Sequence, residues 1–230
     1  MGFQLKPLSQ RLGKATHINR GPVQARQTTL NGRQLILFKC GIGRKKAVDR
    51  VMKALETFEP EAVIFVGLAG SLRPEFKVGD PFVVSSASQW QSKSETLSLD
   101  QALRLQDTYQ NNETPIIKRI KGGNRIRRAR LLTVDAFVNT VREKRRLGTA
   151  GFDIVDMEFG AIASAMDWDE IPLSGLLTIS DSLTHNFPSF SLTTDEDLKK
   201  VPPPRLMVNS FRACKILGGF AHLWIKSYLH

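Results

Sequence analysis

Three features of this 230-residue sequence predict an α/β fold. Short runs rich in β-branched residues alternate with stretches whose apolar residues recur at helical spacing, which is typical of a largely parallel sheet flanked by helices. The chain is long enough for one sizeable core, and 41% of its residues are hydrophobic, which excludes a disordered chain. Because no internal repeat or linker divides it, we expect residues 1–230 to form a single domain with a central mixed, largely parallel twisted sheet.

The first half of the chain supplies a strand, a helix and two further strands. Residues 34–40 form a compact apolar run, and the turn at 41–43 leads into a helix that ends before Pro60. The apolar residues of this helix fall on one face: Ala47, Val48, Val51, Met52, Leu55 and Phe58. The next two strands are expected at residues 63–66 and 81–86.

The second half continues the alternation. Residues 88–112 are polar and mixed, so a loop with a short helix near residues 100–105 is expected there. Further strands are predicted at residues 131–134, 154–158 and 172–179. Helices are predicted at residues 140–147 and 206–229, and directly after residue 158 with inward-facing Ala161, Ile162, Ala165 and Met166.

Composition excludes several classes of protein. The apolar runs are too short to span a bilayer, and no cationic start followed by an apolar stretch indicates secretion, so no membrane contact is expected. Only Cys40 and Cys214 are present, which fits a reducing cytoplasm rather than a disulfide framework. Four histidines lack metal-ligand spacing, so we expect neither a metal nor another cofactor.

The net charge of +11 is concentrated in residues 118–130, which hold seven bases and no acid. Such a run can bind nucleic acid through its phosphates, but this one lacks the interleaved aromatic residues that stack on bases. Gly122-Gly123-Asn124 favours a hairpin turn with solvated flanks. We expect that hairpin and keep weak contact with RNA as the alternative.

Two acidic segments carry the strongest functional signal. Residues 154–161 (IVDMEFGA) and 177–182 (LTISDS) each deliver a carboxylate at the carboxyl end of a β-branched run, where α/β sheets bind their ligands. Two carboxylates at one rim supply an acid and a hydrogen-bond acceptor, which suits cleavage of a glycosidic bond. The alternative is that these two acidic residues only end their strands and have no catalytic role.

Further motifs precede these segments in the order found in a known superfamily. They are KCGIGRKKA at 39–47, VIFVGLAGSL at 63–72, KVGD at 77–80 and LTVDAFV at 132–138. From about Leu30 to Ser182, the series resembles the nucleoside phosphorylase and nucleosidase superfamily. Within it the chain is most similar to the 5′-methylthioadenosine/S-adenosylhomocysteine nucleosidases and their hydrolase relatives.

The resemblance implies roles for the two acidic segments. Asp181, in an Ile-Ser-Asp motif, would protonate the leaving purine at N7, with Ser180 orienting its carboxyl. Partial burial would keep that carboxyl protonated near neutral pH. Met157 and Glu158 would hold the ribose, with the carboxylate strengthening its grip as positive charge develops. Asp156 points to the other side of its strand and is expected to be structural.

The resemblance also implies the walls of the pocket. Ala69 and Gly70, in a glycine-rich turn after the strand at 63–66, would line the ribosyl site. Leu68 replaces a small polar residue that is frequent there. Phe137 and Val138 would sandwich the base. The closing loop over the 5′ substituent would carry His185, Phe187 and Phe190.

Three departures from the family pattern bear on the reaction. The phosphorylases carry an arginine just before the glycine-rich turn, where this chain has Phe65 and Val66. The family's opening strand has no match, so either the strand is absent or the start lies upstream, and a neighbouring strand edge would be exposed. The glutamate that activates water in the hydrolases corresponds to Gln4, which cannot act as a base.

We therefore expect a hydrolase that cleaves the N-glycosidic bond of a purine nucleoside, adenosine-type with a 5′ substituent, and that forms a homodimer or higher homo-oligomer. Asp181 and Gln4 are the candidate catalytic residues. One alternative is a phosphate-dependent phosphorylase. The other is a catalytically weakened nucleoside-binding protein that contacts RNA through residues 118–130.

Overall fold

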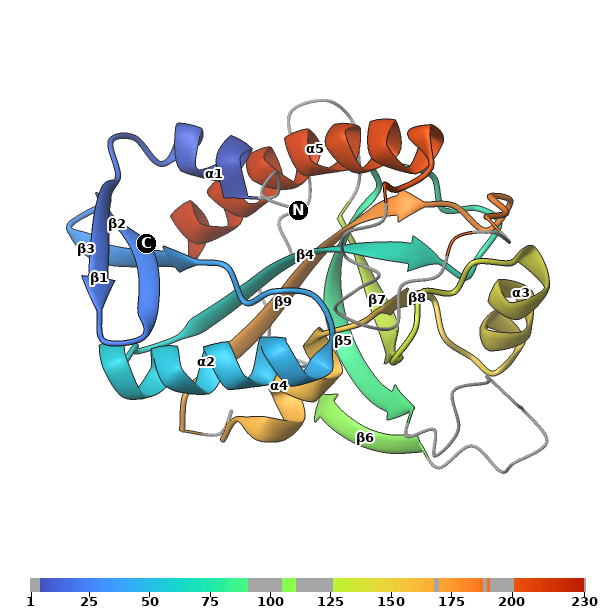
Figure 1. Cartoon of the computed structure of the whole chain (residues 1–230), viewed down its shortest axis with the longest axis horizontal. Helices are drawn as coiled ribbons and strands as arrows, with labels where there is room; N and C mark the ends of the chain where they lie inside the picture. The colour runs from blue at the N-terminus through green and yellow to red at the C-terminus, as the bar shows by residue number, and fades with distance from the viewer. Residues whose placement is uncertain are drawn as a thin grey trace.

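The computed structural model describes residues 5–90, 105–110, 126–167, 170–187, 190 and 201–229. Figure 1 shows the helices and strands in their places. The helices are α1 (Leu5–Arg11), α2 (Arg44–Phe58), α3 (Val141–Thr149), α4 (Phe159–Ala165) and α5 (Pro204–Tyr228). The strands are β1 (Thr16–Arg20), β2 (Val23–Leu30), β3 (Arg33–Phe38), β4 (Val63–Ser71), β5 (Pro81–Trp90), β6 (Leu105–Gln110), β7 (Arg127–Thr133), β8 (Ile154–Asp156) and β9 (Leu173–Asp181).

The central sheet is mixed and curls back on itself. Its strand order is β6-β5-β7-β8-β4-β9, and the start of β5 also pairs with β9. The long pairings β4–β9 and β5–β7 are parallel, as is β7–β8, whereas β4–β8, β5–β6 and β5–β9 are antiparallel. The predicted fold class is thus confirmed. The first three strands form a separate antiparallel sheet, β1-β2-β3.

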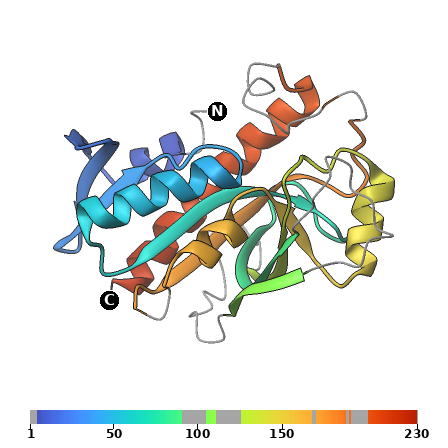
Figure 2. The same cartoon turned by 60° about the horizontal axis from the view of Figure 1, so that its bottom comes forward.

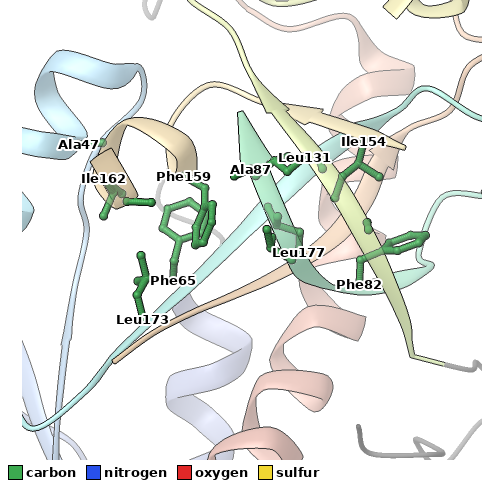
Figure 3. Close-up of a cluster of buried hydrophobic side chains, with 14 of the residues drawn as sticks. Ala47, Phe65, Phe82, Ala87, Leu131, Ile154, Phe159, Ile162, Leu173 and Leu177 are labelled. Carbon is green, nitrogen blue, oxygen red and sulfur yellow. The ribbon is translucent and has the colours of Figure 1, made fainter. Parts of the chain in front are cut away.

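Helices cover both faces of the central sheet, as Figures 1 and 2 show. On one face α2 and α4 enclose the largest apolar cluster, in which the Phe159 ring packs on Phe65 at a centroid distance of 5.6 Å (Figure 3). On the other face α1 and α5 bury Phe220 and Trp224 against β9. Burial of aromatic and aliphatic side chains on both faces is the main stabilising contribution to such a sandwich.

The glycine-rich segment at residues 67–70 is not a turn, which corrects the prediction. It lies inside β4, which continues to Ser71 because its parallel pairing with β9 persists. A register shift between Ala69 and Gly70 brings Gly70 opposite Asp181. A Cβ at Gly70 would lie 3.1 Å from Val155 Cγ1 and 3.8 Å from Asp181 Oδ2. The glycine therefore allows β8 and the candidate acid to pack close to the strand.

Other predictions also differ from the structure. Residues 88–90, predicted to lie in a loop, belong to β5, and β8 ends at Asp156 rather than at residue 158. Residues 105–110 form strand β6 where a loop with a helix near 100–105 was predicted; residues 91–104 and the predicted turn at 122–124 lie outside the described part. Hydrogen bonding along the edge of β5 outweighs the weak local preference of these polar residues. Ala165 is exposed rather than inward, because it ends the short α4 on the side away from the sheet.

The inner edges of β3 and β4 are open. In the described part of the chain, β3 pairs only with β2, and β4 has no strand beside residues 63–69 other than β9. A cavity of about 500 Å³ is lined by these two edges together with residues of α2 and the ends of α1 and α5. This unpaired edge agrees with the expectation of an exposed strand edge.

Two adjacent glycines of α5, Gly218 and Gly219, differ in how closely α1 packs against them. A Cβ at Gly218 would lie 2.8 Å from the Pro7 carbonyl carbon, whereas a Cβ at Gly219 meets nothing closer than 3.7 Å. Alanine raises helix propensity at both positions by about 1 kcal/mol. We expect Gly219→Ala to stabilise the protein by about 0.5–1 kcal/mol and Gly218→Ala to destabilise it by about 1–2 kcal/mol in urea unfolding. Equal effects of the two substitutions would contradict this packing.

Candidate active site

A cavity of about 110 Å³ lies where the ends of β4, β8 and β9 meet the loop after β7. Its lining includes Ile42, Leu68, Ala69, Gly70, Val134, Ala136, Phe137, Val138, Val155, Asp156, Met157, Glu158, Ser180, Asp181, Phe190, Leu206 and Ser210. The predicted site residues are among these with three exceptions. His185 and Phe187 do not line the cavity, although the Phe187 ring lies 6.4 Å from the Phe137 ring, and Gln4 lies outside the described residues. The structure thus brings both predicted carboxyls to one cavity.

Asp181 is the last residue of β9 and only 1% of its surface is exposed. Its Oδ2 accepts a hydrogen bond from the ammonium of Lys144, which is itself fully buried. Burial raises the pKa of the Asp181 carboxyl to about 6, although the Lys144 charge acts to lower it. A carboxyl with such a pKa is protonated in a useful fraction of molecules near neutral pH, as a general acid requires.

Lys144 is a site residue that the sequence analysis missed. Its Nζ also donates to the carbonyl oxygens of Ser182 at 3.1 Å and His185 at 3.0 Å, so all three ammonium protons have acceptors. Burial lowers the pKa of Lys144, while the Asp181 charge opposes that shift. The sequence signal was available, because Lys144 shares the buried face of α3 with Leu147 and Gly148.

The position of α3 determines how deeply Lys144 is buried. Thr140 caps the helix, since its Oγ1 accepts from the Glu143 backbone N–H at 3.2 Å and donates to the Glu143 carboxylate at 2.7 Å. At the other end, a Cβ at Gly148 would lie 2.4 Å from the Leu72 carbonyl oxygen. The helix can therefore approach the end of β4 closely, and its inner face carries Lys144 into the site.

The second oxygen of Asp181 is left for a ligand. Oδ1 is buried and accepts no hydrogen bond from any described residue. His185 Nδ1 lies 3.3 Å away, but it accepts from the Ser182 backbone N–H at 3.3 Å. Burial also lowers the pKa of His185, which favours the neutral ring. Ser180 does not orient the carboxyl as predicted, because its hydroxyl donates to the Ala69 carbonyl oxygen at 3.5 Å.

Glu158 reaches the same cavity from the start of α4. Its Oε1 accepts from the Gly43 backbone N–H at 2.7 Å, which ties it to the turn before α2. Burial raises its pKa to about 8, and the nearby Asp156 charge adds to the shift. Ligand hydroxyls that donate to this carboxyl would favour its ionised form.

The Asp156 carboxylate is engaged in structural hydrogen bonds. Its Oδ1 accepts from the Thr133 hydroxyl at 2.5 Å, and its Oδ2 accepts from the Phe159 backbone N–H at 2.8 Å. These contacts join the end of β7 to the first turn of α4 and thereby place Glu158. This arrangement fits the expected structural role, but Asp156 also lines the cavity and does not lie on the opposite side as predicted.

Aromatic rings close one side of the cavity. The rings of Phe137 and Phe190 meet edge to face at a centroid distance of 5.3 Å. The Phe187 ring lies 5.9 Å from Lys144 Nζ and so shields the Lys144–Asp181 pair. Asn139 fixes this loop, since its amide donates to the Phe190 carbonyl oxygen at 2.9 Å. These contacts form an aromatic wall beside the buried Lys144–Asp181 pair.

The rest of the described surface adds no second site of the expected kinds. Within the described residues, no cluster of His, Cys, Asp and Glu could hold a metal ion. None of the helices in the described ranges is long and apolar enough to cross a membrane. In the basic segment, Arg127 lies over the Phe76 ring and Arg130 pairs with Asp153 at 3.6 Å, so both have partners within the chain.

The fold and this site define an α/β protein with a buried acid and a second carboxyl at one ligand cavity. The chain belongs to the phosphorylase superfamily, whose family model matches residues 1–200.

Individual relatives are distant in sequence. A 5′-methylthioadenosine/S-adenosylhomocysteine nucleosidase from Desulfotalea psychrophila is 23% identical over 209 residues, which cover 86% of this chain and 89% of that protein. A solved variant of the Helicobacter pylori enzyme of the same name, with 5′-methylthioadenosine in its active site, superposes with a TM-score of 0.73 at 17% identity, covering 99% and 95% of the two chains. The futalosine hydrolase of Helicobacter pylori gives a TM-score of 0.72 at 16% identity, covering 99% and 94%.

Proposed function

We propose that this protein is a nucleosidase that hydrolyses the N-glycosidic bond of a purine nucleoside, with 5′-substituted adenosines as its first substrate class. The observation that carries the proposal is the pairing of Asp181 and Glu158 on one cavity, with Asp181 Oδ1 unoccupied by any described donor. The names of the distant relatives, which include 5′-methylthioadenosine/S-adenosylhomocysteine nucleosidase and futalosine hydrolase, support the same class of reaction.

Asp181 acts on the leaving base. Loss of a purine from ribose is slow because the base departs as an anion, and a proton delivered to N7 removes that charge. The proton moves from the Asp181 carboxyl to the base as the bond from the anomeric carbon to nitrogen breaks. The carboxylate that remains is paired with the Lys144 ammonium.

Glu158 and Met157 act on the sugar. The ribose becomes positively charged as the base leaves, and its hydroxyls then donate more strongly to a fixed carboxylate. The Gly43 N–H fixes one Glu158 oxygen and leaves the other for a ribose hydroxyl. Met157 packs against the aromatic cluster and offers the sugar an apolar face.

Water is the favoured nucleophile rather than phosphate. Among the described residues that line the cavity, none is a lysine or an arginine. Phosphate is a dianion that is held by charge-assisted hydrogen bonds, so this lining gives it little affinity. Arg44, the first residue of α2, pairs with Asp135 and donates to the Trp90 carbonyl oxygen at 3.2 Å, so its charge is already engaged.

The nucleoside panel is the direct test. Purified protein is incubated with adenosine, inosine, uridine and 5′-methylthioadenosine, with and without phosphate, and free base is followed by chromatography. We expect adenine from 5′-methylthioadenosine at the same rate in both buffers. Release that requires phosphate and yields ribose 1-phosphate would establish a phosphorylase instead, and release in neither buffer would favour a binding protein.

A homo-oligomer is the second part of the proposal. The exposed large apolar residues of the described chain gather around the start of α5, where Val208 is 68% and Phe211 is 65% exposed. They lie beside Leu206 and Ser210, which line the cavity. Burial of such a patch against a second copy would be favourable.

We expect the wild-type protein to be at least a dimer by light scattering and the Val208→Glu/Phe211→Glu variant to be a monomer. A monomeric wild type would contradict this.

A further inference from the structure

Lys144 stands out among the buried ionisable groups because the proposed reaction uses it only as the partner of the carboxylate left on Asp181. An ammonium with no exposed surface is costly unless its charge is balanced and its protons are bound. Here the balance comes from Asp181 and the remaining protons go to two carbonyl oxygens of the loop that follows β9. An apolar residue would fill the inner face of α3 at less cost.

We propose that Lys144 is a positioning residue for the general acid: it holds Asp181 Oδ2, reserves Oδ1 for the purine, and stabilises the carboxylate left when Asp181 gives up its proton. This inference rests on the proposed nucleosidase function.

The charged groups around Asp181 support the positioning role of Lys144 rather than of a neighbour. Lys144 of α3 contacts the Asp181 carboxylate directly. His185, in the loop after β9, lies 3.3 Å from Asp181 Oδ1, and burial lowers its pKa, which favours the neutral ring. Arg205 of α5 acts on the Asp181 carboxylate at longer range. Glu143 also acts on Lys144 and favours its charged form. Lys144 is thus the one described cation in contact with the carboxylate.

The lysine also links the acid to the loop that shapes the pocket. By binding the carbonyl oxygens of Ser182 and His185, its ammonium holds the turn that leads to Phe187. The Phe187 backbone N–H in turn donates to the Asn139 carbonyl oxygen at 2.7 Å. One buried charge therefore orders both the acid and the aromatic wall. No proton needs to leave Lys144 during turnover, since the proton given to the base comes from Asp181.

The experiment measures the Asp181 titration directly. Protein with ¹³C-labelled aspartate carboxyls is titrated by NMR, and the Asp181 signal is identified by its loss in Asp181→Asn. In Lys144→Met we expect the Asp181 pKa to rise by about one pH unit or more, because the neighbouring positive charge is gone. In parallel, the fall of kcat on the alkaline side should move to higher pH by the same amount, and the plateau kcat should fall about tenfold because a weaker acid remains.

Three variants separate positioning from folding. Lys144→Gln keeps a donor to the loop carbonyls without the charge and should shift the titration as Lys144→Met does. Lys144→Arg keeps the charge and should restore most of the titration midpoint. Arg145→Met removes a positive charge from the exposed side of the same helix and should change neither readout.

The outcomes distinguish this inference from the proposed function. If Asp181 titrates at the same pH in wild type, Lys144→Met and Lys144→Gln, the positioning role is wrong, whatever the activity. If the wild type releases no base from any nucleoside but the titration shifts as expected, the nucleosidase proposal fails while the control of Asp181 by Lys144 stands.

Discussion

Replacing Asp181 with asparagine is expected to lower base release by about 10³-fold, the largest effect of any single substitution in this protein. Asparagine fills the same volume and can still accept from Lys144, but it has no acidic proton to give to the purine. The measurement is the single-turnover rate of adenine release from 5′-methylthioadenosine at pH 6–7, where the raised Asp181 pKa leaves part of the wild type protonated.

Loss of stability could mimic this result, so a matched variant is needed. Asp181→Asn leaves the buried Lys144 charge without its partner, which typically costs about 3–5 kcal/mol. Asp181→Asn/Lys144→Met removes both charges and should recover most of the stability in urea unfolding while remaining inactive. Recovery of activity together with stability would show that Asp181 is structural and would contradict its role as the acid.

Replacing Glu158 with glutamine should produce the second largest effect, a fall in kcat of about 10²-fold. The glutamine oxygen can still accept from the Gly43 N–H at the position seen for Oε1, so the turn before α2 stays in place. What disappears is the negative charge that strengthens its hold on the ribose hydroxyls as the sugar becomes cationic. The loss should therefore fall on kcat, with a smaller change in KM.

The control for Glu158 is Glu61→Gln, which removes the same charge from an exposed pair with Arg33 at 2.7 Å. It should leave both kinetic constants unchanged, since exposed pairs contribute little. If Glu158→Gln raised KM and left kcat unchanged, the carboxylate would serve substrate binding alone and not the transition state.

The sheet and most helices were predictable because their signals are local. The α2 pattern and the β-branched runs of β4 and β9 bury apolar residues at regular spacing, and packing agrees with propensity there. β6 was missed because polar residues 105–110 are extended by pairing with β5, a contact between distant segments. The glycine-rich segment was misread because its glycines serve close packing inside β4 rather than a turn.

The site was predictable where a motif carries the chemistry. Asp181, Glu158 and most of the predicted pocket residues line the same cavity, as the ends of neighbouring strands require. Lys144 was missed because a lysine in a charged helix looks solvated until the helix is docked. The predicted role of Ser180 failed for a similar reason, because its hydroxyl bonds to the neighbouring β4 backbone. Tertiary contacts decide both cases, although the spacing of Lys144 to Leu147 and Gly148 was a local signal that it could be buried.

The most direct test of the proposed chemistry is the fate of the oxygen that attacks the sugar. Wild-type protein is incubated with 5′-methylthioadenosine in H₂¹⁸O containing phosphate, and the sugar product is analysed by mass spectrometry under conditions that limit exchange. We expect free adenine together with a sugar that carries one ¹⁸O at the anomeric carbon. An unlabelled ribose 1-phosphate derivative, or intact substrate after prolonged incubation, would contradict hydrolysis by this protein.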